Sequence, residues 1–192
     1  MKKNIVLLIA GLLLISGNVW AGQGEGKAFR EQVKKERQEH RQQQQQENQA
    51  FRQTLQGKSQ AEKVAAVTAH RETQYQENKA FDVQEHQKNT SFLESKLAAN
   101  TKMTQAQKTE LINHFESQYQ ENVNFRDQRH NANIAYFQKI ANDPSLIPEQ
   151  KKAAIKTYMD QQKAQDKAHH QEQRSENQVE KAKIRSEIQS QK

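Results

Sequence analysis

Residues 72–81 have the sequence ETQYQENKAF, and residues 116–125, which lie 44 positions further along the chain, have the sequence ESQYQENVNF. A match of this length at a fixed distance indicates an internal repeat, in which each copy forms one structural unit. Both copies lie within residues 58–143, a stretch that contains neither glycine nor proline. Because these two residues interrupt helices most strongly, the repeat predicts long α-helices.

Three helix-start signals recur at nearly the same spacing as the repeat. The first two, SQAE at 59–62 and TQAQ at 104–107, have the capping-box pattern, in which a hydroxyl accepts from a backbone amide and a Glu or Gln reaches back. In the third, IPEQ at 147–150, the proline suits the first helical position, although the isoleucine supplies no side-chain cap. The residues of these helix-cap motifs are Ser59, Thr104, Gln107, Pro148 and Gln150.

These signals predict an all-α protein in which long antiparallel helices are joined by short turns. The expected form is an elongated helical hairpin or bundle with a repeat of about 44 residues. The predicted helices span 27–56, 59–98, 104–141 and 148–190. One alternative is that the second and third helices continue as one through Ala99-Asn100-Thr101, but a threonine cap in register with turns at Gly57 and Pro144 favours a break.

The first 21 residues have the organisation of a secretory signal peptide. Lys2 and Lys3 precede an apolar run over 5–15, and the small residue Ala21 ends the segment. The run is shorter than the roughly 20 apolar residues of a membrane span. We therefore expect export to the periplasm and a soluble mature protein, in which 22–192 form a single elongated α-helical domain with polar N- and C-terminal segments.

Apolar residues make up only 33% of the chain, and they concentrate in the second and third predicted helices. These two helices are expected to supply most of the core. By contrast, Glu31–Gln49 hold one aliphatic residue and Asp160–Gln178 hold none. Helices that are polar all round are solvent-bridging, stabilised by side-chain pairs or unstable. We therefore expect a thin bundle that gains stability by self-association, as a homodimer or small homo-oligomer.

The composition excludes several classes of function. The chain has no cysteine, so a disulfide framework, a thiolate metal site and a cysteine nucleophile are ruled out. It also lacks a glycine-rich phosphate loop, a nucleophile elbow and an HExxH motif, which predicts a protein that is not an enzyme and needs no cofactor. The formal net charge is +7, but acidic and basic residues are interspersed. We expect weak contact with anionic envelope surfaces and no nucleic-acid binding.

Histidine is the remaining candidate for site chemistry. Folding the chain at residue 100 suggests two cross-helix pairs, His70 with His130 and His86 with His114. A helical wheel argues against metal binding by these pairs, because their side chains do not converge. Solvated histidines, or histidines at the edge of an interface, are therefore favoured. A weak surface site for zinc or copper is predicted at His169 and His170.

The cap motifs also resemble a known family. MTQAQ at 103–107 and LIPEQ at 146–150 are similar to the paired LTxxQ motifs that open helices in the Spy/CpxP family of periplasmic stress proteins. Met103 replaces the leucine of that motif, and Ile147 replaces its threonine. The general plan of signal peptide, long helices and basic charge is similar too. The resemblance implies a cradle-shaped dimer that holds unfolded or damaged envelope proteins without ATP.

The leading functional hypothesis is therefore an ATP-independent, chaperone-like envelope stress protein. A thin bundle cannot cover both sides of its apolar stripes, so aromatic residues at the seam between the second and third helices are expected to stay partly exposed and to bind clients. The predicted client-binding residues are Phe81, Phe92, Phe115 and Phe125, and the alternative is that these aromatics are buried in the bundle or in a dimer interface. Two alternatives are a helical protein that binds metal or polyanions and a structural, self-assembling helical protein of the envelope.

Overall fold

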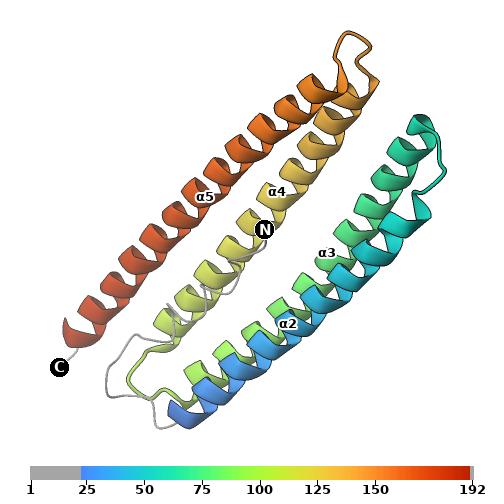
Figure 1. Cartoon of the computed structure of the whole chain (residues 1–192). Coiled ribbons are helices and arrows are strands. Elements are labelled where there is room, and N and C mark those ends of the chain that lie inside the picture. Colours follow the sequence, from blue (N-terminus) through green and yellow to red (C-terminus); the bar gives the residue numbers. More distant parts are fainter. Residues whose placement is uncertain (1–22, 191–192) are drawn as a thin grey trace. The chain divides into compact units, whose positions relative to one another are not determined.

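The computed structural model describes residues 23–190, and these form four α-helices and no strand (Figure 1). The helices are α2 (Gln23–Thr54), α3 (Gln60–Ala99), α4 (Gln105–Asn142) and α5 (Pro148–Ser190). The all-α architecture of long helices and short turns is therefore confirmed. The predicted signal peptide at 1–21 lies outside the described residues. None of the described helices has an apolar stretch long enough to cross a membrane.

The predicted cap motifs begin three of the helices. Thr104 accepts a hydrogen bond from the Gln107 amide over 3.2 Å, and the Gln107 side chain accepts one from the Thr104 amide over 3.0 Å. Ser59 and Glu62 make the same reciprocal pair before α3, over 3.4 and 2.8 Å. At α5, the Gln150 side chain accepts from the Ile147 amide over 3.1 Å, so one orphan donor is satisfied although Ile147 supplies no cap.

Three short turns separate the helices. Gly57 has a φ of 74°, a left-handed conformation that favours glycine, and it lies between α2 and α3. Between α3 and α4, the Asn100 side chain accepts from the Lys102 amide over 2.9 Å, an Asx turn that closes the connection. Asp143 accepts from the Ser145 amide in the same way before α5. The predicted break near Asn100 is therefore confirmed.

Contacts group the chain into two compact units. The N-terminal unit is Ala21–Lys88, and the C-terminal unit takes in Asn89–Lys192, so the boundary falls within α3. In the N-terminal unit, α2 runs antiparallel to the first part of α3. In the C-terminal unit, α4 runs antiparallel both to the end of α3 and to α5. The expectation of a single domain over 22–192 stays a prediction.

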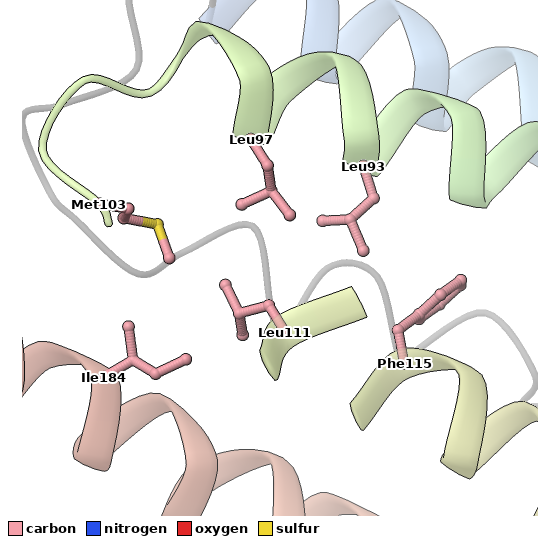
Figure 2. Close-up of a cluster of buried hydrophobic side chains, with 6 residues drawn as sticks. All are labelled: Leu93, Leu97, Met103, Leu111, Phe115 and Ile184. Carbon is pink, nitrogen blue, oxygen red and sulfur yellow. The ribbon is translucent and has the colours of Figure 1, made fainter. Parts of the chain in front are cut away.

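The apolar core lies in the C-terminal unit, at the end where α3 gives way to α4 (Figure 2). Leu111 is 1% exposed and Ile184 is fully covered, and Ile112 and Ile188 pack against the outside of the cluster. The second and third predicted helices do supply most of this cluster, as expected, and α5 adds one residue. The members of the cluster are Leu93, Leu97, Met103, Leu111, Phe115 and Ile184.

The N-terminal unit is buried differently. Val33 is the one buried apolar side chain among its described residues, whereas Arg37, Gln44 and Glu85 are buried polar or charged side chains. Arg37 Nε donates to Glu85 Oε1 over 2.6 Å, so a charged pair occupies part of the space that a core would fill. Burial of apolar area therefore contributes far less to this unit than to the C-terminal one.

Candidate functional site

One polar motif occurs once in each of the four described helices and marks where the helices pair. It consists of histidine, glutamine and asparagine at positions i, i+4 and i+8, with phenylalanine at i+11 in three of the four copies, and these positions share one face of a helix. We call this set the pairing motif. Its copies are His40, Gln44, Asn48 and Phe51 in α2; His70, Gln74, Asn78 and Phe81 in α3; His114, Gln118, Asn122 and Phe125 in α4; and His169, Gln173, Asn177 and Glu180 in α5.

Within each unit, the histidine of one copy meets the asparagine of the other, in both directions. In the N-terminal unit, Nε2 of His40 lies 3.1 Å from Oδ1 of Asn78, and Nε2 of His70 lies 3.1 Å from Oδ1 of Asn48. In the C-terminal unit, His114 reaches Asn177 over 2.9 Å and His169 reaches Asn122 over 3.1 Å. Each pair of helices is therefore joined by two equivalent hydrogen bonds.

The direction of these hydrogen bonds follows from the asparagines. Nδ2 of Asn48, Asn78 and Asn122 each donates to the backbone carbonyl four residues earlier, over 2.6, 2.5 and 2.8 Å. The amide oxygen is therefore turned toward the partner helix, where it can only accept. Nε2 of the facing histidine must carry the proton and donate it. This hydrogen bond fixes the orientation of the imidazole ring. Because Nε2 is protonated, it cannot coordinate a metal ion.

Three of the four histidine rings also stack on a phenylalanine of the facing helix. The ring centroids are 4.2 Å apart for His40 and Phe81, 3.9 Å for His70 and Phe51, and 4.2 Å for His169 and Phe125. The rings are within 16° of parallel in each case. Such contacts are worth about 0.5–1.5 kcal/mol beyond the area that they bury. The fourth copy differs, because Glu180 stands where the others have phenylalanine.

The glutamines lie at the centre of the paired motifs. In the C-terminal unit, Nε2 of Gln118 donates to the backbone carbonyl of Gln173 over 3.3 Å, and Nε2 of Gln173 donates to the carbonyl of Gln118 over 3.4 Å. Both side chains are buried, at 1% and 4% exposure. In the N-terminal unit, Gln44 occupies the equivalent position and is 2% exposed. In the C-terminal unit, a two-fold symmetric set of polar contacts therefore replaces the usual apolar layer at this level.

Ion pairs flank the motif in the N-terminal unit. Burial raises the pKa of the Glu85 carboxyl, and the hydrogen bond from Arg37 acts in the opposite direction. One turn away, Lys88 Nζ donates to Glu36 over 2.8 Å, and this hydrogen bond lowers the pKa of Glu36. Removing one member of the buried Arg37–Glu85 pair would leave the other charge in a poorly solvated place.

The structure brings the predicted metal ligands His169 and His170 close together without forming a larger site. Their ring centroids are 6.1 Å apart, and His169 is already engaged by Asn122 and Phe125. Burial lowers the pKa of His170, and His169, Arg174 and Arg129 lower it further. Among residues 23–190, no group of three or more His, Asp or Glu could hold a metal ion. Weak zinc or copper binding at the pair stays a prediction.

Two histidines of the pairs suggested by folding the chain at residue 100 have described partners within their own units. His70 contacts Asn48 and Phe51 of α2, and His114 contacts Asn177 of α5. Both histidines therefore lie at an interface between two helices, and the favoured interpretation of solvated or interface-edge histidines stays a prediction for His86 and His130.

The predicted client-binding aromatics have three different environments. Phe115 is 5% exposed and belongs to the core cluster, so the expectation that it stays partly exposed is wrong. Its side chain is covered because the end of α3 and α5 both pack on the first turns of α4 (Figure 2). Phe92 is half-buried, and Lys96 Nζ lies 5.3 Å from its ring. Phe81 and Phe125 are half-buried in equivalent positions of the pairing motif.

Sequence reasoning missed most of the pairing motif, although the signal was present. The match between 72–81 and 116–125 contains the Gln, Asn and Phe of two copies, and extending it by two residues adds His70 and His114. The copies in α2 and α5 fall in segments that hold almost no aliphatic residues. A search for apolar stripes passes over them, because their periodic residues are polar.

Comparisons with known proteins gave no match: no protein-family profile, no curated protein and no solved structure matched the chain.

Proposed function

We propose that the protein is an ATP-independent holder of unfolded proteins in the periplasm, and that the N-terminal unit is the part that opens to accept a client. The observation that supports this proposal is the composition of the α2–α3 interface. It holds aromatic rings, yet Val33 is the one buried apolar side chain among the described residues of the unit. Opening such an interface exposes its aromatic rings to a client. It costs little free energy, because few apolar side chains are fully buried there.

The aromatic rings would be the groups offered to a client. Phe51 and Phe81 are half-buried, and each is covered by a histidine ring of the facing helix. When α2 separates from α3, these rings lose one stacked neighbour and become accessible. An unfolded segment that covers them gains about 25 cal/mol for each Å² of apolar surface removed from water.

The polar contacts make this opening reversible. A net intramolecular hydrogen bond contributes only about 0.5–1.5 kcal/mol, because water replaces it when the helices separate. His40, Asn48, His70 and Asn78 are therefore well solvated in the open form, whereas a large apolar interface would resist opening and aggregate once open. The surplus of basic residues keeps an open complex charged, because residues 22–192 hold 28 Lys and Arg against 23 Asp and Glu.

The function is tested with residues 22–192 and a cysteine-free client diluted from denaturant. Stoichiometric protein should slow client aggregation, and no ATP should be required. The chain has no cysteine, so the pair Gln44→Cys with Gln74→Cys places a single crosslink between α2 and α3. Oxidation of this variant should abolish the protection, and reduction should restore it.

The matched control is Gln118→Cys with Gln173→Cys, which crosslinks α4 to α5 at the same position of the pairing motif. Oxidation of this control should leave protection unchanged. A second matched pair is Phe81→Ala and Phe125→Ala, which remove the same stacked ring from the N-terminal and C-terminal units. Only Phe81→Ala should weaken protection. Aggregation at the same rate with and without the wild-type chain would contradict the proposal.

A further inference from the structure

The paired motifs have a symmetry that permits more than one partner for each helix. Exchanging the two helices of a unit leaves the contacts unchanged in kind: His40 to Asn78 becomes His70 to Asn48, each over 3.1 Å. The same holds for α4 and α5, with the reciprocal hydrogen bonds of Gln118 and Gln173 at the centre. A helix that carries the motif is therefore complementary to any antiparallel helix that also carries it.

From this symmetry we propose that a second copy of this chain pairs with the first by exchanging α2. In the exchanged dimer, α2 of each copy lies against α3 of the other and makes the contacts that it makes within one chain. The Arg37–Glu85 pair, at 2.6 Å within one chain, forms again between copies and sets the same register. The same interface forms in the monomer and in the dimer, and only the conformation of the connection between α2 and α3 changes.

The connection at 55–59 has the properties of a hinge. It is short, and its Gly57 has a φ of 74°. Three backbone hydrogen bonds close its turn, donated by the Leu55, Gln56 and Lys58 amides to the Arg52, Gln53 and Leu55 carbonyls, and they are long, at 3.3, 3.3 and 3.4 Å. Because the hydrogen bonds that close the turn at 55–58 are long, this turn can straighten at small cost, and straightening separates α2 from α3 of the same chain.

The N-terminal unit is the place where exchange is expected, because the two units differ in what opening costs. Separating α5 from the C-terminal unit would expose Ile184, which is fully covered, and uncover Leu111. Separating α2 uncovers Val33 and a set of polar contacts. A second copy of this chain is the partner that fits best, since it supplies the motif with the same spacing and the same flanking charges.

This inference rests on the same opening of α2 from α3 as the proposed function, but the two can fail separately. Protection of a client by a protein that stays monomeric would leave the function standing and remove the exchange. Exchange of α2 in a protein that does not protect a client would support the exchanged dimer and remove the proposed function.

The experiment mixes two pools of residues 22–192, Gln44→Cys in isotopically normal protein and Gln74→Cys in ¹⁵N-labelled protein. After a denaturation and refolding cycle and mild oxidation, mass spectrometry identifies the disulfides. A disulfide that joins residue 44 of one copy to residue 74 of the other is expected, together with a dimer by light scattering at micromolar concentration. A monomer at every concentration, or a dimer without this disulfide, would overturn the proposal.

Changes of glycine to alanine sharpen the test. Gly57→Ala places a side chain in a left-handed turn with open space around it, so it adds strain to the closed form without a clash. It should raise the dimer fraction relative to wild type, with a dimerisation constant about 100-fold higher, because the strain, worth about tenfold in each copy, is relieved in both copies. Gly24→Ala is the control, because that glycine is helical, exposed and also has open space around it. An equal effect of both changes would contradict a hinge at Gly57.

Discussion

The N-terminal and C-terminal units use the same pairing motif but differ in what surrounds it. The C-terminal unit adds an apolar cluster that includes Leu111, Phe115 and Ile184. The N-terminal unit adds a buried ion pair, Arg37 with Glu85, and a single buried valine among its described residues. The comparison separates two roles that are usually combined in one core: polar contacts define which helices pair and in what register, and apolar burial sets how firmly they stay paired.

The largest effect should come from breaking the buried ion pair of the N-terminal unit. Arg37→Met removes the partner of Glu85 and leaves a buried carboxylate, which costs about 3–5 kcal/mol in comparable cases. We expect the α2–α3 pair to separate while the C-terminal unit remains folded. Urea denaturation followed by circular dichroism would show this as an early loss of helix signal.

A double variant controls for the size of the substituted side chain. Arg37→Met with Glu85→Leu replaces both charges by apolar groups, so no charge is left buried and the stability should return to the wild-type value or above it. If the single change is harmless, the pair does not hold the N-terminal unit together.

The next effect concerns the apolar cluster. Leu111→Ala should lower the free energy of unfolding of the C-terminal unit by about 2–5 kcal/mol, because it opens a cavity at a side chain that is 1% exposed. Val33→Ala, the corresponding change in the N-terminal unit, removes fewer atoms from a smaller apolar neighbourhood and should cost less. Differential scanning calorimetry would resolve the two transitions. Equal losses from the two changes would mean that apolar burial does not distinguish the units.

A smaller effect is expected from the motif itself. Asn48→Ala and Asn122→Ala each remove the acceptor for a histidine on the facing helix, His70 and His169, and each should cost about 1 kcal/mol. The same cost should open the N-terminal unit more often than the C-terminal one, because less apolar burial opposes opening there. Proteolysis near Gly57, measured for both variants, would reveal this difference. Resistance unchanged in both variants would show that the hydrogen bonds do not contribute.

The smallest effect is a dependence on pH that arises from Glu85. Burial raises the pKa of this carboxyl. The folded state therefore binds the proton more tightly than the unfolded chain, and the stability that this group contributes below its unfolded pKa is lost as the pH rises through the folded value. Glu36 acts in the opposite sense, since the hydrogen bond from Lys88 lowers its pKa and its contribution is lost as the pH falls.

Glu85→Gln should remove the first of these contributions. Denaturation midpoints of the N-terminal unit at about pH 4 and about pH 7 should show that wild type, compared with this variant, loses stability as the pH rises. The same slope in both proteins would assign the pH dependence to other groups.

The fold could be predicted from the sequence because the residues that start and end its helices act locally. Ser59, Thr104 and Pro148 each act within one turn of helix, and the left-handed turn at Gly57 needs no distant partner. The all-α architecture follows from these signals together with the absence of other glycines and prolines after Gly57 and before Pro144.

The candidate site could be predicted only in part, because it depends on which helices face each other. The sequence predicts Phe81 and Phe125 as partly exposed client-binding aromatics, and the structure places them against His40 and His169. Phe115 lies in the core instead, packed with the end of α3. Apolar periodicity shows which residues share a face, but it does not show which polar residues cover that face from the partner helix.

The central claim is that the N-terminal unit opens more readily than the C-terminal unit, and native-state hydrogen exchange tests it most directly. Amide exchange of residues 22–192 would be measured at low denaturant and neutral pH, without a client. We predict that amides of α2 and of α3 up to Lys88 exchange through an opening of clearly lower free energy than amides of α4 and α5. A single free energy of opening for all helices, or stronger protection in α2 than in α4, would contradict the account.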